Sequence, residues 1–317
     1  MSSTIGNITV LMPAYNCAAY LKQSIRSILN QTFKEFEFLI IDDGSTDNTE
    51  EIVNSFKDSR IVYNRTNENK GTAAALNFGL KMAAGNWIAR IDADDLNTAD
   101  RLETQINFIK DNPQYDIISS WSVYFRNRSK ILFALKEPVV HSDIHRYLNL
   151  HNPLNQSGLF FKKEKVINHG FDEKYLYNED FELLHRIRDE VKFYNIPQFL
   201  VYTRVRKDSK TFTQKNNNIY DFLFPTAFKS LMEPLSKGRS FYWASTIAWI
   251  NFFYGERRDA RSYFLNSFSP KNWIAYLTTF LPENIFYKMI DLRIKYRLKA
   301  IFTSNKLYKK KLKKLLQ

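Results

Sequence analysis

The sequence predicts an α/β fold in which a Rossmann-like, mostly parallel sheet carries helices on both faces and is followed by a helical C-terminal region. Short apolar runs alternate with segments of helical periodicity through about residue 120, and this alternation is typical of a parallel sheet covered on both faces. The last third of the chain is instead rich in aromatic residues and has helical spacing.

The predicted elements follow one another in the first 120 residues. Strands are expected at residues 8–12, 36–41, 60–63, 86–91 and 115–120. A helix is expected after the first strand, where these apolar residues recur at helical spacing: Leu21, Ile25, Ile28 and Leu29. A second helix is expected over residues 98–110, which carry Leu102, Ile106 and Ile109 at the same spacing.

The remaining residues divide into two parts. Residues 121–205 are a mixed extension, with strands expected at 131–135, 159–161 and 199–202 around a helix that begins near Asn178. Residues 207–218 are polar, as in a loop or hinge. We therefore predict one domain at residues 1–216, with halves at 1–120 and 121–216, and a basic, aromatic-rich helical region at 217–317.

Polar loops follow three of the predicted strands, at residues 13–16, 42–47 and 92–95. In open sheets of this class, ligands bind beyond the carboxyl ends of the strands, so these loops are expected to converge on one crevice. The segment 69–75 begins a helix with small residues, which permit either close packing or close approach of a ligand.

Three carboxylates lie within four residues at the end of the fourth predicted strand: Asp92, Asp94 and Asp95. Such a cluster repels itself unless a cation compensates it. Mg²⁺ and Mn²⁺ take oxygen ligands and often bridge carboxylates to phosphates. The cluster therefore predicts a metal and diphosphate site.

The composition and the first residues of the chain indicate the cellular compartment of the protein. Cys17 is the only cysteine, which excludes an intramolecular disulfide framework and a zinc–thiolate cluster and suits a reducing environment. The first residues lack the pattern of a secretory signal. The longest nearly apolar window, residues 241–254, is shorter than the about 20 residues that span a bilayer. We expect a cytoplasmic protein without a spanning helix.

The net charge of +13 is carried almost entirely by the last third of the chain. Residues 1–216 hold 28 Lys and Arg against 27 Asp and Glu, whereas residues 217–317 hold 18 against 6. Basic residues interleave there with aromatic ones, which suits an anionic membrane surface. A helical subdomain packed on the first domain, or a solvated basic face, fits the same composition.

Five segments, in this order, resemble glycosyltransferase family 2, an inverting family with a GT-A fold: residues 10–16, 27–32, 41–47, 90–95 and 178–180. The resemblance extends from residue 8 to about residue 206. It implies that residues 1–120 bind a nucleotide-sugar and that residues 121–216 bind the acceptor.

On the donor side, the resemblance implies that Pro13, Tyr15 and Asp43 border the nucleobase, Tyr15 by stacking and Asp43 by accepting a hydrogen bond. Asp92 would hold the ribose or the water shell of the metal, and Asp94 would coordinate Mn²⁺ or Mg²⁺ directly. Lys70 and Arg90 complete the candidate donor contacts, and Asp42 and Asp47 are expected to serve the loop itself.

On the acceptor side, the family places its catalytic base in a Glu-Asp pair at the start of a helix. Glu179 and Asp180 match that pair, so the resemblance implies that Asp180 is the base and that Glu179 contacts the acceptor. Asp180 in the first helical turn is also explained by favourable interaction with the helix dipole. Trp121 is a further candidate for acceptor contact.

The chain departs from the family at two positions. Relatives often carry Arg-x-His after the last core strand, whereas this chain has Arg204, Val205 and Arg206. Arg206 cannot ligate a metal but could pair with the diphosphate, so a third protein ligand is not expected. Asn155 stands where relatives often have a histidine. His151 lies nearby, but a lone histidine is more often structural or exposed than a metal ligand.

The resemblance predicts an inverting glycosyltransferase of class EC 2.4, of hexosyl or N-acetylhexosaminyl type. It would use a UDP-linked sugar and a glycan or lipid-linked glycan acceptor in the biosynthesis of a polysaccharide, lipopolysaccharide or capsule, as a peripheral protein on the inner face of the cytoplasmic membrane. A nucleotidyl- or phosphotransferase is an alternative, although no glycine-rich phosphate loop is evident. A non-enzymatic basic module binding membrane or nucleic acid leaves the acidic residues unexplained, and no nucleic-acid partner is expected.

Overall fold

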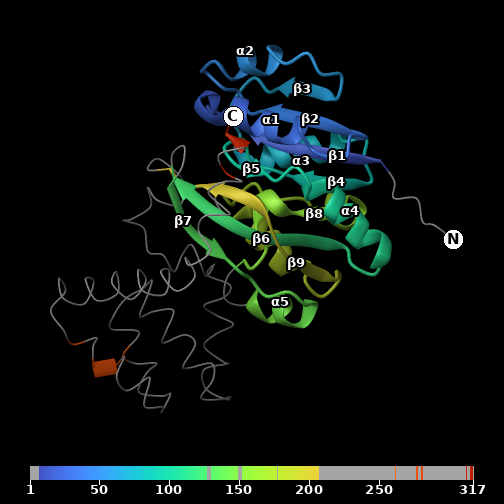
Figure 1. The fold of residues 1–317 in the computed structure, drawn as a ribbon, viewed down its shortest axis with the longest axis vertical. Helices are drawn as coiled ribbons and strands as arrows, with labels where there is room; N and C mark the ends of the chain where they lie inside the picture. The colour runs from blue at the N-terminus through green and yellow to red at the C-terminus, as the bar shows by residue number, and fades with distance from the viewer. Residues whose placement is uncertain are drawn as a thin grey trace. The chain divides into compact units, whose positions relative to one another are not determined.

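One mixed sheet organises the first 206 residues of the computed structural model (Figure 1). The structure describes these residues: 7–126, 130–148, 152–176, 178–206, and the single positions 261, 276, 277, 280, 312, 315 and 316. Within them, nine strands form the sheet in the order β3-β2-β1-β4-β8-β6-β9-β5, and β7 pairs with β6. The α/β fold class predicted above is confirmed.

The chain separates into two units, one of residues 1–206 with 304–317 and the other of residues 207–303. The first unit contains every strand and helix considered below. The predicted helices and basic character of residues 217–317 lie almost entirely outside the described residues. No helix in the described part of the chain combines the length and the apolar character needed to cross a bilayer.

The N-terminal half of the sheet is parallel, as predicted. It contains β1 (Ile8–Ala14), β2 (Phe36–Asp42), β3 (Ile61–Arg65) and β4 (Trp87–Arg90), with β1 between β2 and β4. Successive residues of β1 face opposite layers of core, because Val10 and Met12 belong to one buried cluster and Leu11 to the other. Both faces of this half are therefore covered.

Helices pack on these two faces. Helix α1 (Ala18–Leu29) buries the predicted Leu21, Ile25 and Ile28 in the first cluster, and α4 (Arg101–Asp111) buries the predicted Leu102, Ile106 and Ile109 there. Helix α2 (Thr49–Asn54) lies beside α1 in the chain's fold (Figure 1). On the other face, α3 (Thr72–Met82) buries Ala73 and Ala75, so these small residues serve packing.

The second half of the sheet is mixed. Strand β6 (Ile117–Arg126) pairs in parallel with β9 (Phe193–Arg204), while β8 (Phe160–Lys162) lies antiparallel between β4 and β6. The short β5 (Leu96–Asn97) pairs with β9, and β7 (Lys130–Leu135) pairs with β6. Strand β9 begins six residues before the predicted 199, because its N-terminal part pairs with Ile117 to Ser120.

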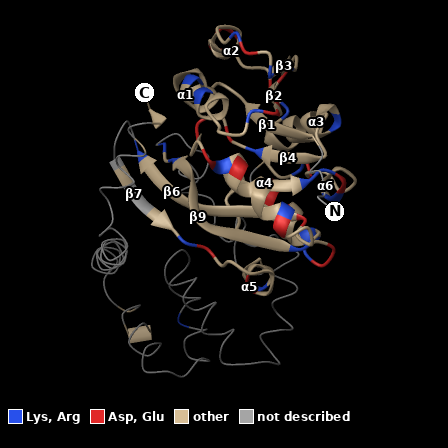
Figure 2. Cartoon of the chain, turned by 45° about the vertical axis from the view of Figure 1, so that its right-hand side comes forward, with Lys and Arg blue, Asp and Glu red and all other residues tan. Residues whose placement is uncertain are grey.

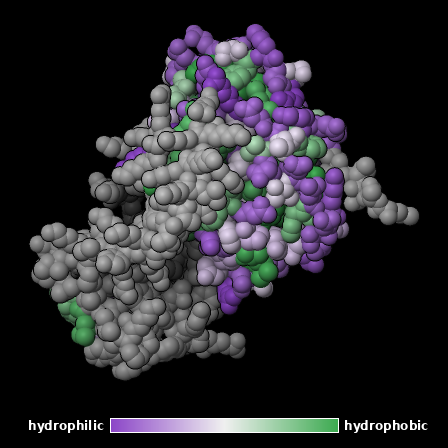
Figure 3. Space-filling view, viewed as in Figure 1, coloured by the Kyte–Doolittle hydropathy of each residue, from purple (hydrophilic) through white to green (hydrophobic). Residues whose placement is uncertain are grey.

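Short helices connect these strands, and two of them position the site described below. They are α5 (His141–Tyr147), the 3-10 turn η1 (Gln156–Gly158), α6 (Glu164–Ile167) and α7 (Glu179–Arg186). Lys, Arg, Asp and Glu alternate along the described helices, strands and loops, in agreement with the balanced count for residues 1–216 (Figure 2). The visible described surface is mainly hydrophilic, with scattered apolar residues (Figure 3).

A buried arginine fixes the turn η1 against α4. The Arg101 side chain is fully buried, and its guanidinium donates to Asn97 Oδ1, to Gln105 Oε1 at 3.0 Å and to the Leu159 carbonyl at 2.9 Å. Gln105 Nε2 donates in turn to the Gly158 carbonyl at 2.8 Å. Burial lowers the pKa of Arg101 to about 9, since these acceptors are neutral.

Replacing Arg101 with alanine is expected to lower the free energy of unfolding by about 2–4 kcal/mol, because three buried acceptors lose their donor. Chemical denaturation monitored by circular dichroism measures this change. Lys110→Ala, at an exposed position of the same helix, is the matched control and should stay within about 0.5 kcal/mol of the parent. Equal midpoints for the two variants would contradict the role given to Arg101.

Candidate functional site

The acidic residues that follow β4 each contact an arginine or the end of β9. Arg90 Nη2 lies 3.2 Å from Asp92 Oδ1, and Arg206 Nε lies 3.0 Å from Asp94 Oδ2. Asp95 is buried and accepts from the backbone N–H of Arg204 at 2.7 Å. The carboxyl ends of β4 and β9 therefore meet at this cluster.

Asp95 serves the architecture of the cluster. Besides the Arg204 N–H, it accepts a hydrogen bond from Ser157 Oγ at 2.6 Å, which joins the segment after β4 to η1. Burial, together with the neighbouring Asp94 and Asp92, holds the pKa of this carboxyl well above its usual range. These contacts place Asp95 within the turn that follows β4.

Arginines already compensate the charge of this cluster. Arg90 pairs with Asp92, Arg206 pairs with Asp94, and Arg204 Nε donates to the Asp94 carbonyl at 2.8 Å. Burial raises the pKa of Asp94, while Arg206 opposes that rise. Self-repulsion of the carboxylates thus does not by itself require a bound cation, and this corrects the charge-balance reasoning applied to the sequence.

A divalent cation nevertheless fits the donor set. The described residues contain no group of three or more His, Cys, Asp or Glu able to hold a metal. Asp92 and Asp94 can each offer the carboxylate oxygen that does not face an arginine. Mg²⁺ commonly takes only one or two protein carboxylates and completes its shell with substrate phosphates and water. The two aspartates therefore suit a cation that arrives with a diphosphate.

Arg90 joins this cluster to α7. Its side chain is only 1% exposed, and Nη2 donates to Gln156 Oε1 at 2.9 Å and to Glu179 Oε1 at 3.0 Å in addition to its contact with Asp92. The other two guanidinium nitrogens have no hydrogen-bond partner among the described residues. Arg90 is therefore buried among Asp92, Gln156 and Glu179, and its contact with a donor stays a prediction.

Asp180 lies in the first turn of α7 and is almost fully buried. Asn152 Nδ2 donates to its Oδ2, whereas its Oδ1 has no partner among the described residues. Burial and the adjacent Glu179 raise the pKa of Asp180 to about 6, although Arg90 opposes the rise. A carboxylate with this pKa is ionised at neutral pH and is more basic than an ordinary aspartate.

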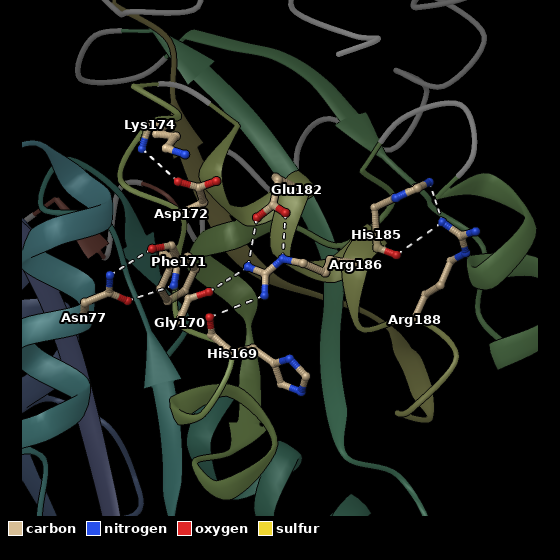
Figure 4. A network of polar contacts seen from close by, with 10 residues as sticks. All are labelled: Asn77, His169, Gly170, Phe171, Asp172, Lys174, Glu182, His185, Arg186 and Arg188. Carbon is tan, nitrogen blue, oxygen red and sulfur yellow. Dashed lines mark hydrogen bonds and ion pairs between the residues drawn. The ribbon is translucent and has the colours of Figure 1, made fainter. Parts of the chain in front are cut away.

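The segment that leads into α7 is firmly attached to its surroundings. Arg186 pairs with Glu182 and donates to the Gly170 carbonyl at 2.8 Å, while Asn77 of α3 exchanges two hydrogen bonds with the backbone of Phe171 (Figure 4). Asn178 then adopts a left-handed backbone conformation, with φ of 57°, directly before Glu179. Asparagine is one of the few residues other than glycine that adopt this conformation routinely, and Asn178 lies two positions before Asp180.

The predicted nucleobase contacts lie at the ends of β1 and β2. The loop after β1 is fixed to the loop after β2, since Asn16 accepts from the Thr46 N–H and donates its own N–H to Ser45. Tyr15 in this loop is 44% exposed and does not belong to the core. Pro13 is half-buried within β1.

Asp43 is buried and organises the loop before α3. It accepts from the backbone N–H groups of Lys70 at 3.0 Å and Gly71 at 2.7 Å. The Lys70 side chain is exposed and pairs with Glu68. Asp42 and Asp47 also bind loop groups, as predicted, because Asp42 accepts from the Ser45 N–H and Asp47 from the Ala18 N–H.

Trp121 is not brought to the acidic cluster by any contact in the structure. Its indole donates to the Glu137 carbonyl, packs against Phe199 and lies below Lys136. The described histidines are also elsewhere: His145 pairs with Asp189 and His169 with Glu190, while His151 lies outside the described residues. Asn155 Nδ2 donates to Thr203 Oγ1, and its Oδ1 has no hydrogen-bond partner among the described residues.

Three polar residues of the site were not singled out from the sequence: Asn152, Gln156 and Ser157. They contact Asp180, Arg90 and Asp95, respectively. Their signal is a polar segment directly before the strand that pairs with β4. Antiparallel pairing of β8 with β4 brings the residues before β8 to the carboxyl end of β4.

Comparison with protein families gives a match over half of the chain. The model of the family described as "Glycosyl transferase family 2" matches residues 9–171. An uncharacterized glycosyltransferase of Methanocaldococcus jannaschii is 32% identical over 68% of this chain and 77% of its own length. The UDP-Glc:alpha-D-GlcNAc-diphosphoundecaprenol beta-1,3-glucosyltransferase WfaP of Escherichia coli is 31% identical over 64% of this chain and 78% of its own length.

Solved structures share the fold at low sequence identity. TarS 1-349 of S. aureus, in complex with UDP, superposes with a TM-score of 0.55 at 18% identity and covers 86% of this chain and 90% of its own. The mannosyltransferase PcManGT of Pyrobaculum calidifontis, in complex with GDP-Man and Mn²⁺, gives 0.52 at 16% identity over 99% and 86%. These likenesses extend the agreement from sequence motifs to the sheet topology.

Proposed function

The chain belongs to glycosyl transferase family 2, and from this premise we propose that it transfers a sugar from a UDP-linked donor to an acceptor hydroxyl with inversion at the anomeric carbon. Glycosyl transfer itself follows from the family. The observation that carries the finer proposal is the position of Arg90, which joins Asp92 to Glu179 beside Asp180. One buried side chain thus connects the proposed donor and acceptor sides.

Asp180 is the proposed general base. Its carboxylate removes the proton of the acceptor hydroxyl as that oxygen attacks the anomeric carbon, and the bond from this carbon to the diphosphate oxygen breaks with release of the nucleoside diphosphate. A pKa of about 6 keeps the carboxylate ionised at pH 7 while bringing its basicity close to the working pH. Asn152 orients the carboxylate through Oδ2.

Asp94 and Asp92 are the proposed ligands of Mn²⁺ or Mg²⁺. When bound, the cation supplies positive charge to the diphosphate oxygens as the leaving group departs. Arg206 is positioned to pair with the same diphosphate, because its guanidinium already lies beside Asp94. PcManGT, with GDP-Man and Mn²⁺, supports cation use within this fold.

The nucleobase would lie between the loops after β1 and β2. Tyr15 is exposed there and can stack on a base, and Pro13 and Lys70 border the same loops. Asp43 would accept a hydrogen bond from the base only through lone pairs that Lys70 and Gly71 leave available. TarS, solved with UDP and with UDP-GlcNAc, supports a uridine nucleotide.

The acceptor proposal rests on relatives alone. WfaP is named for a diphosphoundecaprenol-linked GlcNAc acceptor, which supports a lipid-linked glycan here and a role in polysaccharide, lipopolysaccharide or capsule synthesis at the inner face of the cytoplasmic membrane. Glu179 and Trp121 stay proposed acceptor contacts, as does hexosyl or N-acetylhexosaminyl transfer. Membrane contact by residues 217–317 stays a prediction, since almost all of these residues lie outside the described part of the chain.

Donor binding is the direct test of this function. UDP-glucose or UDP-GlcNAc with Mn²⁺ is expected to raise the melting temperature of the protein, because ligand that binds only the native state stabilises it by mass action. GDP-, CMP- and dTDP-sugars at the same concentration are the comparison set. Stabilisation by a GDP-sugar alone would identify the donor as GDP-linked instead of UDP-linked. No stabilisation by any of these sugar nucleotides would contradict the proposal.

A further inference from the structure

The ion pair between Arg206 and Asp94 uses one oxygen of the carboxylate at which the cation is proposed to bind. Nε of Arg206 lies 3.0 Å from Asp94 Oδ2, and the two side chains are 23% and 21% exposed. The guanidinium carbon of Arg206 also lies 5.4 Å from the centre of the Tyr20 ring. The pair is therefore supported by an aromatic face and is still reachable from solvent.

The end of β9 delivers Arg206 to this position. Arg204, two residues earlier, is fixed by its N–H to Asp95 and by its guanidinium, which lies 4.7 Å from the Tyr20 ring and 4.6 Å from the Phe125 ring. The Val205 N–H donates to the Phe125 carbonyl at 2.8 Å. The backbone up to residue 205 is thus anchored, and it holds the partly exposed side chain of Arg206 beside Asp94.

Arg90 differs from Arg206 in this respect. It pairs with Asp92 from a fully buried position and shares the same nitrogen with Gln156 and Glu179, so it cannot leave without breaking the site. Arg206 carries its charge on a partly exposed side chain. Of these two arginine–aspartate pairs, the one at Asp94 has the more exposed arginine.

We propose that Arg206 is a built-in cation at Asp94 which a divalent metal ion must displace, and that the donor diphosphate promotes this exchange by pairing with Arg206. A metal ion and a guanidinium on one carboxylate would repel each other, because both carry positive charge within a few ångströms in a partly buried site. A diphosphate offers Arg206 another anion. The inference rests on the proposed function in two respects, the cation at Asp94 and the identification of that diphosphate as the donor's.

The exchange couples metal and nucleotide binding. If UDP raises the affinity for Mn²⁺, then Mn²⁺ raises the affinity for UDP by the same factor, and such couplings typically reach about 5–150-fold. Part of that factor should come from Arg206. Removing its charge is expected to strengthen metal binding to the free protein and to reduce the additional effect of UDP.

The test is a Mn²⁺ titration of the full-length protein by electron paramagnetic resonance, first without nucleotide and then with UDP. Arg206→Gln is expected to bind Mn²⁺ at least about 5-fold more tightly than the parent when no nucleotide is present. Arg206→Lys, which keeps the charge, should bind more weakly than Arg206→Gln. Arg146→Gln removes an exposed arginine of α5 that pairs with Asp143, and it should match the parent.

Two results would overturn the proposal. One is Mn²⁺ binding by nucleotide-free Arg206→Gln that is no tighter than that of the parent, in a variant with an unchanged circular dichroism spectrum. The other is a gain that persists in Asp94→Asn/Arg206→Gln, because the metal would then lie at another site. The nucleotide-free titration involves no sugar donor, so a failure of every UDP-sugar to bind would contradict the proposed function and leave this comparison intact.

Discussion

Asp180→Asn is expected to lower turnover by a factor on the order of 10² or more while leaving the affinity for the sugar nucleotide nearly unchanged. The amide cannot accept the acceptor's proton, whereas the donor-side residues Asp92 and Asp94 are untouched. Steady-state kinetics give the turnover, and isothermal titration with UDP gives the donor affinity. Turnover equal to that of the parent would exclude Asp180 as the base.

The same variant should be more stable than the parent at pH 7. Burial raises the pKa of Asp180 to about 6, so the folded protein holds a proton that the unfolded chain releases near pH 4, and the stability of the parent falls as the pH rises through that interval. Asparagine stays neutral and avoids this loss, which is on the order of 1–3 kcal/mol. A melting temperature lower than that of the parent would indicate a structural role instead.

The pH profile of kcat/KM provides a control on this assignment. Activity is expected to rise with pH through an apparent pKa near 6, because the base must be ionised. Glu179→Gln removes the neighbouring charge that raises the pKa of Asp180, so its rising limb should move to lower pH. An unchanged limb in Glu179→Gln would assign the titration to another group.

Asp94→Ala is expected to weaken Mn²⁺-dependent binding of the UDP-sugar by about 10-fold or more, because the cation loses its proposed direct ligand and the diphosphate loses the cation. Isothermal titration with Mn²⁺ and then with a chelator separates the metal-dependent part of donor affinity. Asp111→Ala, which removes an exposed acid at the end of α4, is the matched control.

The chelator decides the interpretation of that experiment. Parent protein in chelator and Asp94→Ala in Mn²⁺ should bind the donor with similar affinity if Asp94 acts through the metal. Parent affinity that is the same with and without chelator would argue against metal-assisted binding altogether. An effect of Asp94→Ala that persists in chelator would point to Arg206, which loses its partner in that variant.

Local pattern predicted much of the fold. The apolar runs of the first 120 residues and the helical spacing of Leu21, Ile25 and Ile28 describe β1, β2 and α1 well, because a sheet buried on both faces imposes these patterns directly on the sequence. The length of β9 was underestimated. Its first residues include Asn195, which pairs with Ser119 of β6, and Pro197 and Gln198, which lie at a shift in the register between the two strands. This part of the strand forms through pairing of its neighbours with β6 instead of through its own composition.

The candidate residues Asp43 and Asp92 were recognisable because each follows a strand, and Asp180 because it begins a helix. The partners of these residues were not predictable, because they come from distant parts of the chain. Gln156 meets Arg90 across 66 residues, and Arg204 meets Asp95 across 109. Single-sequence patterns contain no information on such pairs, so the arginine compensation of the acidic cluster became visible only in the structure.

The shared nitrogen of Arg90 limits how this enzyme can be recombined with its relatives. A chimera that joins residues 1–120 of one transferase to the following residues of another would have to inherit compatible partners at Gln156 and Glu179, since Arg90 meets both of them. A chimera that lacks one of Arg90, Gln156 and Glu179 would leave the guanidinium or the carboxylate buried without its partner. Donor and acceptor preference are therefore expected to evolve here as linked traits.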